Sequence, residues 1–220
     1  MIPAFDAAIL DMDGTITDTM PLWARVAPAI CRRYRLDLPR QRVEEIIREM
    51  YFRSLTQSAR WFIDTYHLAA EPQEIVDLAW QVMARAYRES ARLKPGAARY
   101  LEQAHRRGMP LWVATASGKA LAQEVLDRLG VLRYLGGILT CEELGTDKNH
   151  PDIFLEAARR MGTPPQRTAV FEDSPHSLET ARRAGFVTIG FAEPVWAFAE
   201  ERMRAACHRY VAGFEELLAQ

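Results

Sequence analysis

Short apolar runs alternate with longer amphipathic stretches along most of the chain, and this alternation predicts its elements. The apolar runs lie at residues 7–10, 111–114, 137–140, 168–171 and 187–190. Strands that are apolar on both faces and are joined by helices indicate a parallel sheet with right-handed crossovers. We therefore predict an α/β fold with a Rossmann-like parallel sheet core, which ends in a short edge strand at 210–212 and a helix at 214–218.

The stretch between the first two runs breaks this rhythm. Leu10 and Leu111 are much further apart than the roughly 30 residues that a strand–helix–strand unit requires. Between them, apolar residues recur at helical steps, and no stretch has strand periodicity. This predicts an all-helical cap domain at residues 15–94, inserted into a core domain of residues 1–14 and 95–220. Because the insertion joins the core where strands end, we expect it to act as a lid.

Composition narrows the class of protein. The 220 residues are 49% hydrophobic and 26% charged with a formal net charge of -1, and without a basic excess we expect no nucleic-acid partner. No apolar stretch reaches membrane-spanning length and no leader pattern precedes the first strand, so we expect no membrane partner. The widely spaced cysteines indicate reduced thiols in a cytoplasmic protein. We expect a monomer or a homodimer.

Candidate chemistry concentrates where the predicted strands end. Asp11 and Asp13 follow the first strand, just before Gly14, and carboxylates so close together repel each other unless they hold a cation or a proton. The same pattern also occurs in solvated turns, so it decides nothing alone. Further polar residues follow the later strands in order, namely Thr115, Lys148, Glu172 and Asp173. Since the carboxyl ends of parallel strands meet at one edge of a sheet, we expect all of these to converge.

Taken in order, the motifs Asp-x-Asp-x-Thr, Thr, Lys and Glu-Asp-Ser resemble the four motifs of the haloacid dehalogenase superfamily. The resemblance implies a member with a helical cap, similar to the β-phosphoglucomutase-like proteins and sugar-phosphate phosphatases. By this resemblance Asp11 is the nucleophile that forms an aspartyl-phosphate, and Asp13 is the general acid and base. Mg²⁺ is the implied cofactor, held by the Asp11 carboxylate, the Asp13 main-chain carbonyl and the Asp173 carboxylate, with Glu172 acting through a bound water.

The remaining candidates are expected to contact the substrate. The resemblance gives Lys148 the role of a positive charge, and Thr115 that of a hydroxyl donor, beside the phosphate oxygens. Ser117 and Gly118 precede a predicted helix and are expected to add main-chain N–H groups near its positive end. The cap residues expected to grip the organic part of the substrate are Trp23, Tyr51 and Arg53.

Fold alone does not decide the reaction within this superfamily. Asp13 suits phosphate esters, whereas dehalogenases of the superfamily typically lack it, and a phosphonatase route needs a cap lysine, which residues 15–92 do not contain. The mutase-type members usually carry a histidine where this chain has Trp23. We therefore predict a Mg²⁺-dependent phosphatase of a small phosphorylated metabolite, a sugar or polyol phosphate. A β-phosphoglucomutase-like mutase is the alternative, and a catalytically silent phosphometabolite-binding or interaction module is the second.

Overall fold

The computed structural model describes residues 3–51 and 53–218, and contacts within it divide the chain into two compact units. One unit comprises the chain up to Asp18 and from Arg92 onward, and the other is Thr19–Ala91. The helical unit is a few residues shorter than the expected insertion. The Asp18 N–H donates to the Arg92 carbonyl and the Lys94 N–H to the Ile16 carbonyl, both at 2.9 Å, so the two connecting segments belong with the α/β unit.

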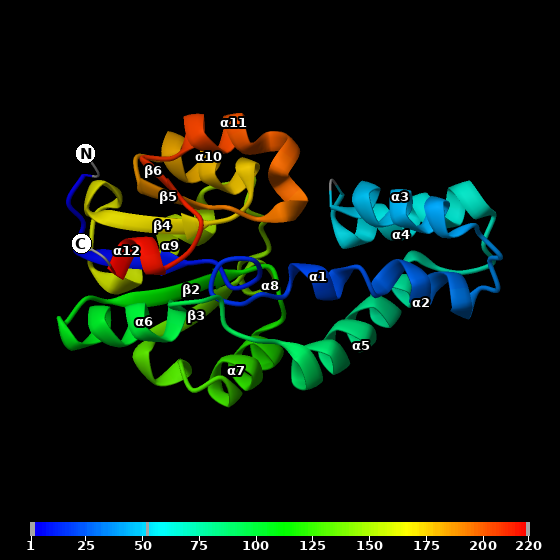
Figure 1. Cartoon of the computed structure of the whole chain (residues 1–220), viewed down its shortest axis with the longest axis horizontal. Coiled ribbons are helices and arrows are strands. Elements are labelled where there is room, and N and C mark those ends of the chain that lie inside the picture. Colours follow the sequence, from blue (N-terminus) through cyan, green and yellow to red (C-terminus); the bar gives the residue numbers. More distant parts are fainter. Residues whose placement is uncertain (1–2, 52, 219–220) are drawn as a thin grey trace. The chain divides into compact units, whose positions relative to one another are not determined.

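Six strands form one parallel sheet in the α/β unit (Figure 1). They are β1 (Ala7–Leu10), β2 (Leu111–Thr115), β3 (Gly137–Thr140), β4 (Thr168–Glu172), β5 (Val187–Phe191) and β6 (Arg209–Val211). Their order across the sheet is β3-β2-β1-β4-β5-β6, so β1 lies between β2 and β4. The predicted α/β fold with a helical insertion is confirmed, and the last strand starts one residue earlier than expected.

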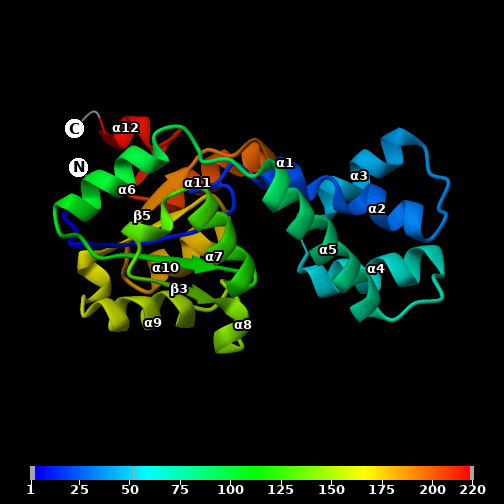
Figure 2. The same cartoon turned by 90° about the horizontal axis from the view of Figure 1, so that it is seen from below.

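Helices cover both faces of this sheet. They are α6 (Ala97–Arg106), α7 (Lys119–Arg128), α8 (Cys141–Leu144), α9 (Asp152–Met161), α10 (Pro175–Arg183), α11 (Glu200–Ala206) and α12 (Glu215–Leu218), with the 3₁₀ turns η1 (Leu132–Tyr134), η2 (Pro165–Arg167) and η3 (Pro194–Ala199). Figure 2 shows α6 and α9 on opposite sides of the strands. Val170 packs in the core cluster that contains Phe154 of α9, whereas the ring of Phe171 lies 5.6 Å from that of Tyr100 of α6. This is the alternation of side chains that a strand buried on both faces requires.

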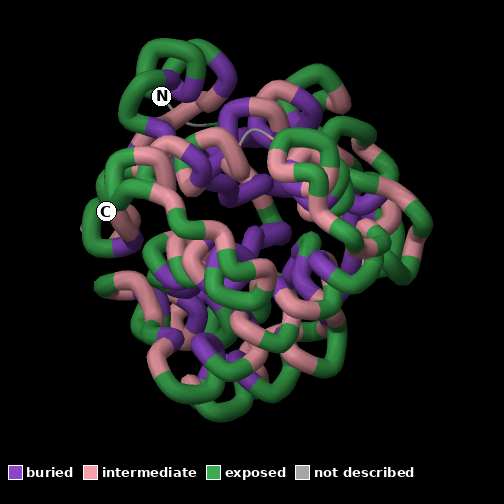
Figure 3. Tube along the Cα trace, turned by 90° about the vertical axis from the view of Figure 1, so that its right-hand side faces the viewer, coloured by how far each residue is buried: buried purple, intermediate pink, exposed green. Residues whose placement is uncertain are grey.

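The second unit contains helices joined by turns and loops, and no strand among its described residues. They are α1 (Met20–Trp23), α2 (Val26–Arg33), α3 (Arg40–Met50), α4 (Leu55–Tyr66) and α5 (Pro72–Ser90). Pro39 and Glu71 stand at the starts of α3 and α5, and Ser54 caps α4 through a hydrogen bond from the Gln57 N–H. Figure 3 shows buried positions along the inner faces of the elements and exposed positions along the turns. No helix in the described part of the chain is both long enough and apolar enough to cross a membrane.

Candidate active site

The first two carboxylates lie on a tight turn at the end of the central strand. Asp11 directly follows β1, and its N–H donates to the Phe171 carbonyl oxygen at 2.9 Å. The chain then reverses, because the Gly14 N–H donates to the Thr17 carbonyl oxygen at 2.8 Å. Gly14 has a φ of 85°, a left-handed conformation that glycine adopts at little cost. The turn therefore keeps Asp11 and Asp13 at the carboxyl end of the sheet.

A hydrogen bond connects Asp13 to the turn that follows β2. Ser117 Oγ donates to Asp13 Oδ2 at 2.8 Å and so orients that carboxylate. The Ser117 N–H was expected to face phosphate, but it donates to Thr115 Oγ1 at 3.0 Å, within the turn. Gly118 precedes α7 with a φ of -61°, and a Cβ at this position would meet no described atom within 4 Å. Ser117 thus enters the site through its hydroxyl group.

Lys148 is the buried cation of the site. Its side chain is 9% exposed, and Nζ donates to Asp11 Oδ1 and, at 2.5 Å, to Glu172 Oε1. Burial lowers the pKa of Lys148, but the charges of the Asp11 and Glu172 carboxylates outweigh burial and raise this pKa above its ordinary value. The side chain is therefore an ammonium group at neutral pH, and it holds the two carboxylates on either side of it.

The acidic residues of the site fit a divalent cation. Asp11, Glu172 and Asp173 each place a carboxylate oxygen within 4.8 Å of the others. Burial raises the pKa of both Asp11 and Asp173 well above the usual value, and the charge of Glu172 adds to this rise. Across residues 3–51 and 53–218, no group donates a hydrogen bond to Asp173 Oδ2. Lys148 brings only one positive charge to three carboxylates. A hard ion that takes oxygen ligands, such as Mg²⁺, suits the negative charge that Lys148 leaves uncompensated.

Two residues near this cluster were given no role from the sequence, although Ser174 belongs to the Glu-Asp-Ser motif. Ser174 donates to Glu172 Oε2, through Oγ at 3.2 Å and through its N–H at 3.4 Å. Glu193 is 4% exposed, forms an ion pair with Lys94, and adds its charge to those that raise the pKa of Asp173. The available signal was position, because Ser174 follows the Glu-Asp pair and Glu193 comes just after β5, at the same edge of the sheet as the predicted residues.

The three residues predicted to grip substrate belong to the helical unit and have contacts inside it. These contacts are the edge-to-face packing of Trp23 on Trp80 (ring centroids 5.7 Å apart), the hydrogen bond from Tyr51 Oη to the Met20 carbonyl (3.1 Å), and the bond from Arg53 Nη1 to the Glu49 carbonyl (3.0 Å). The Arg53 guanidinium also lies 5.2 Å from the centre of the Trp61 ring. All three side chains are half-buried, so their role toward substrate stays a prediction.

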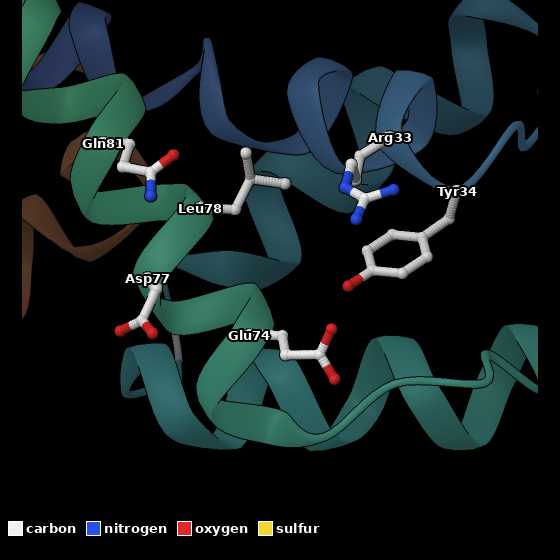
Figure 4. A pocket seen from close by; sticks show the side chains of 6 residues that line it. All are labelled: Arg33, Tyr34, Glu74, Asp77, Leu78 and Gln81. Carbon is white, nitrogen blue, oxygen red and sulfur yellow. The ribbon is translucent and has the colours of Figure 1, made fainter.

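A cavity of about 300 Å³ lies within the helical unit, between the end of α2 and one face of α5 (Figure 4). It is lined by Arg33, Tyr34, Glu74, Asp77, Leu78 and Gln81. Glu74 already accepts a hydrogen bond from the Glu71 N–H at 2.9 Å, and Asp77 accepts one from Gln73 at 2.8 Å. None of the predicted site residues lines this cavity. Its acidic side chains already form hydrogen bonds at the start of α5, the helix to which they belong.

A family model described as haloacid dehalogenase-like hydrolase matches residues 5–185 of the chain. The chain belongs to this family. The resemblance of its motifs is thus confirmed, and the protein is a haloacid dehalogenase-like hydrolase. It is 30% identical to a probable pseudouridine-5'-phosphatase of Drosophila melanogaster, over 84% of this chain and 81% of the fly protein. It is 28% identical to the fructose-1-phosphate phosphatase YqaB of Escherichia coli, over 84% of this chain and 95% of the bacterial protein.

Solved structures share the fold of this haloacid dehalogenase-like hydrolase. CbbY from Rhodobacter sphaeroides, in complex with phosphate, matches 99% of this chain and 96% of its own with a TM-score of 0.79 and 24% identity. A putative β-phosphoglucomutase from Thermotoga maritima matches 98% of this chain and 97% of its own with a TM-score of 0.77 and 22% identity. At these identities the likeness concerns the fold alone.

Proposed function

We propose that the protein is a phosphoric monoester hydrolase that requires Mg²⁺ and forms an aspartyl-phosphate on Asp11. The proposed substrate is a small phosphorylated metabolite, a sugar or polyol phosphate. Membership of the haloacid dehalogenase-like hydrolases supports hydrolysis. Similar proteins named fructose-1-phosphate phosphatase and hexitol phosphatase B support a sugar or polyol substrate.

The buried contact of Lys148 with both Asp11 and Glu172 is the observation that carries this proposal. A carboxylate that attacks a phosphate dianion needs positive charge beside it, because two anions otherwise repel each other. Lys148 supplies that charge at the nucleophile itself, and the raised pKa of this lysine keeps the charge in place. A lysine on the protein surface would supply far less in water.

The first proposed step transfers the phosphoryl group to the enzyme. A carboxylate oxygen of Asp11 forms a bond to phosphorus while the bond from phosphorus to the ester oxygen breaks. The departing oxygen takes a proton from the Asp13 carboxyl group. Because Ser117 donates to Asp13 Oδ2, the proton to be transferred belongs on Oδ1. The freed alcohol is the first product.

The second proposed step returns Asp11 to its starting state. Asp13, now a carboxylate, takes a proton from a water molecule whose oxygen attacks phosphorus, and the bond from phosphorus to the Asp11 oxygen breaks. Inorganic phosphate leaves, and Asp13 again carries its proton. The proposed holders of Mg²⁺ are the carboxylates of Asp11 and Asp173, the Asp13 main-chain carbonyl and Glu172. When bound, Mg²⁺ supplies positive charge that offsets the charge of the phosphoryl oxygens.

The helical unit is the proposed source of substrate preference. Trp23 and Tyr51 offer ring surface for a sugar or polyol, and Arg53 offers a charged donor. Arg53→Ala tests this role, with Arg85→Ala, an exposed arginine of the same unit, as the matched control. We expect Arg53→Ala, but not the control, to change the order of preference among substrates. An unchanged order would remove Arg53 from the proposal.

The decisive experiment measures phosphate release from a panel of sugar, polyol and nucleotide monophosphates, with and without Mg²⁺. Native protein, Asp11→Asn and Asp6→Asn are compared, because Asp6 is an exposed aspartate that pairs with Arg167 on the surface. We expect metal-dependent release that is lost in Asp11→Asn and kept in Asp6→Asn. Release that survives in Asp11→Asn would contradict the aspartyl-phosphate, and no release from any substrate would favour the mutase or the silent binding module.

A further inference from the structure

The serine that begins α10 is not used as a helix cap. A serine at this position ordinarily accepts a hydrogen bond from an N–H of the first turn, which stabilises the helix. Within the described residues, the Ser174 side chain makes no such bond. Its Oγ instead lies 3.2 Å from Glu172 Oε2 and 2.8 Å from Ser177 Oγ. The helix thus forgoes a stabilising contact, and the hydroxyl is directed toward the active site.

Ser177 completes this arrangement from inside the helix. Its side chain is fully buried, one turn into α10, and its hydroxyl is in hydrogen-bonding distance of the Ser174 hydroxyl. The Ser174 hydroxyl donates to Ser177 Oγ and to Glu172 Oε2, and because it has a single proton, the two acceptors share it. The bond to Ser177 is the shorter one, at 2.8 Å against 3.2 Å. By accepting this bond, Ser177 holds the Ser174 side chain in the rotamer that reaches Glu172.

The same carboxylate holds the catalytic lysine. Glu172 accepts from Ser174 on Oε2 and from Lys148, at 2.5 Å, on Oε1. Lys148 in turn contacts Asp11. The exposed fractions of Ser177, Glu172 and Lys148 are 0%, 1% and 9%. Hydrogen bonds in such a buried network of side chains are stronger than in water, and each bond restrains the side chain that makes the next one.

We propose that Ser177 is a positioning residue for the reaction at Asp11. It acts through Ser174, which sets the rotamer of Glu172, and Glu172 keeps Lys148 against the nucleophile. This inference rests on the proposed function, because it concerns the rate of the phosphatase reaction. Neither Ser177 nor Ser174 contacts the Asp11 carboxylate in the described structure, so their effect on turnover passes through Glu172 and Lys148.

A double-mutant cycle tests the route of this effect. Ser174→Ala, Ser177→Ala and the double variant are compared with native protein for kcat, KM and thermal unfolding. Each single substitution should lower kcat by about 10-fold or more with little change in KM, as loss of an outer partner typically does. The double variant should match Ser174→Ala, because Ser177 has no other route to Glu172. The control is Ser58→Ala, which removes a buried hydroxyl of the helical unit and should leave kcat unchanged.

Two kinetic outcomes would overturn the proposal. One is a native kcat in Ser177→Ala with an unchanged unfolding temperature. The other is an effect of Ser177→Ala that is as large in the Ser174→Ala background as in native protein, because the serines would then act independently.

A crystal structure of Ser177→Ala keeps this test separate from the proposed function. If native protein releases no phosphate from any substrate, the phosphatase proposal fails and the structure alone decides. We expect the Ser174 hydroxyl, no longer held by residue 177, to turn away from Glu172 and cap α10. A Ser174 hydroxyl that stays on Glu172, with the Glu172 rotamer unchanged, would show that Ser177 positions nothing.

Discussion

Lys148 balances charge in the α/β unit more than any other described side chain of the site, because it pairs with two buried carboxylates. Lys148→Met keeps a side chain of similar length and removes the charge. The Asp11 carboxylate then faces the substrate phosphate without a cation of the protein beside it. We expect kcat to fall by at least about 100-fold, the loss seen when a charge-stabilising donor is removed from an active site. Steady-state phosphate release measures this.

Lys119→Met is the matched control for that substitution. Lys119 pairs with Glu143, and its side chain is 46% exposed. Exposed ion pairs contribute little to stability, so this variant should keep native kcat and native unfolding temperature. Equal losses of activity in the two lysine variants would mean that the charge of Lys148 has no special role.

Without a bound cation, we expect the ionised Asp173 carboxylate to lower the free energy of unfolding. Burial and neighbouring charges raise its pKa, which means that folding disfavours its ionised form. The free energy of unfolding therefore decreases as pH rises from the ordinary aspartate pKa through the raised one. At a pH above the raised value, Asp173→Asn should increase the free energy of unfolding of metal-free protein by about 1 kcal/mol or more.

In the presence of Mg²⁺ we expect the opposite effect on stability for native protein and Asp173→Asn. Mg²⁺ binds the folded state, so it should raise the unfolding temperature of native protein, and a chelator should reverse this. Asp173→Asn should lose most of that rise. Denaturant titrations with and without Mg²⁺ measure both effects. If Asp173→Asn is less stable than native protein in the absence of metal, the buried Asp173 carboxylate does not destabilise the fold.

At the scale of elements, the strands and helices follow closely from the sequence. Each buried strand of a parallel sheet is covered on both faces, so its run is apolar apart from single threonines and contains no charged residue. Pro39 and Glu71 stand directly before α3 and α5, and Pro72 follows Glu71, so the starts of these helices carry local sequence signals. The rule that polar residues gather at the carboxyl ends of strands also located Asp11 and Asp173 without any structure.

Side-chain partners did not follow from the sequence, because they depend on distances between elements. Lys148 was expected to face phosphate oxygens, and its bond to Glu172 depends on how the turn after α8 packs on the end of β4. The Ser117 hydroxyl reaches Asp13 only because β1 and β2 are neighbours in the sheet. Sequence periodicity identifies the face of an element but not the atom that a side chain contacts.

A histidine couples β5 to the segment before β6, and this connection should weaken in acid. His208 Nδ1 accepts the Thr188 N–H at 3.0 Å, which requires the neutral imidazole. Burial, with the charge of Arg182, lowers the pKa of His208. The unfolded state therefore binds a proton more readily, so stability is complete above about pH 6.5, the ordinary histidine value, and decreases as pH falls through the lowered pKa.

His208→Asn tests this contact, because an asparagine oxygen can accept the same N–H without titrating. Urea unfolding is compared over the pH range around and below the ordinary histidine pKa. The stability of native protein relative to the variant should decrease as pH falls, while titration of the other histidines cancels in the comparison. A difference that is constant with pH would show that protonation of His208 does not weaken the contact.

At the scale of the whole molecule, the chain leaves and re-enters the α/β unit at neighbouring points. The Asp18 N–H donates to the Arg92 carbonyl at 2.9 Å, and Thr17 and Leu93 form an antiparallel bridge. A short glycine-serine linker can therefore join Asp18 to Arg92 in place of Thr19–Ala91. We expect this shortened protein to unfold cooperatively, because its sheet and both covering layers are complete.

Activity of the shortened protein tests whether the α/β unit carries out the reaction and the helical unit determines the substrate preference. It should still hydrolyse a small artificial ester such as p-nitrophenyl phosphate with Mg²⁺. Its preference among sugar and polyol phosphates should disappear, because the proposed substrate-gripping residues are gone. Loss of cooperative unfolding would show that the α/β unit depends on the insertion, and an unchanged preference would show that selectivity lies in the α/β unit.

The central position of β1 has a consequence for synthesis on the ribosome. β1 is made first, yet its partners are Leu111–Thr115 and Thr168–Glu172. All of Thr19–Ala91 is synthesised before either partner strand. The helical unit can therefore fold while β1, which Asp11 follows, is still unpaired. The carboxylates and the lysine meet only once β4 has emerged. A nascent chain therefore carries no assembled catalytic centre until late in translation, and then acquires its parts together.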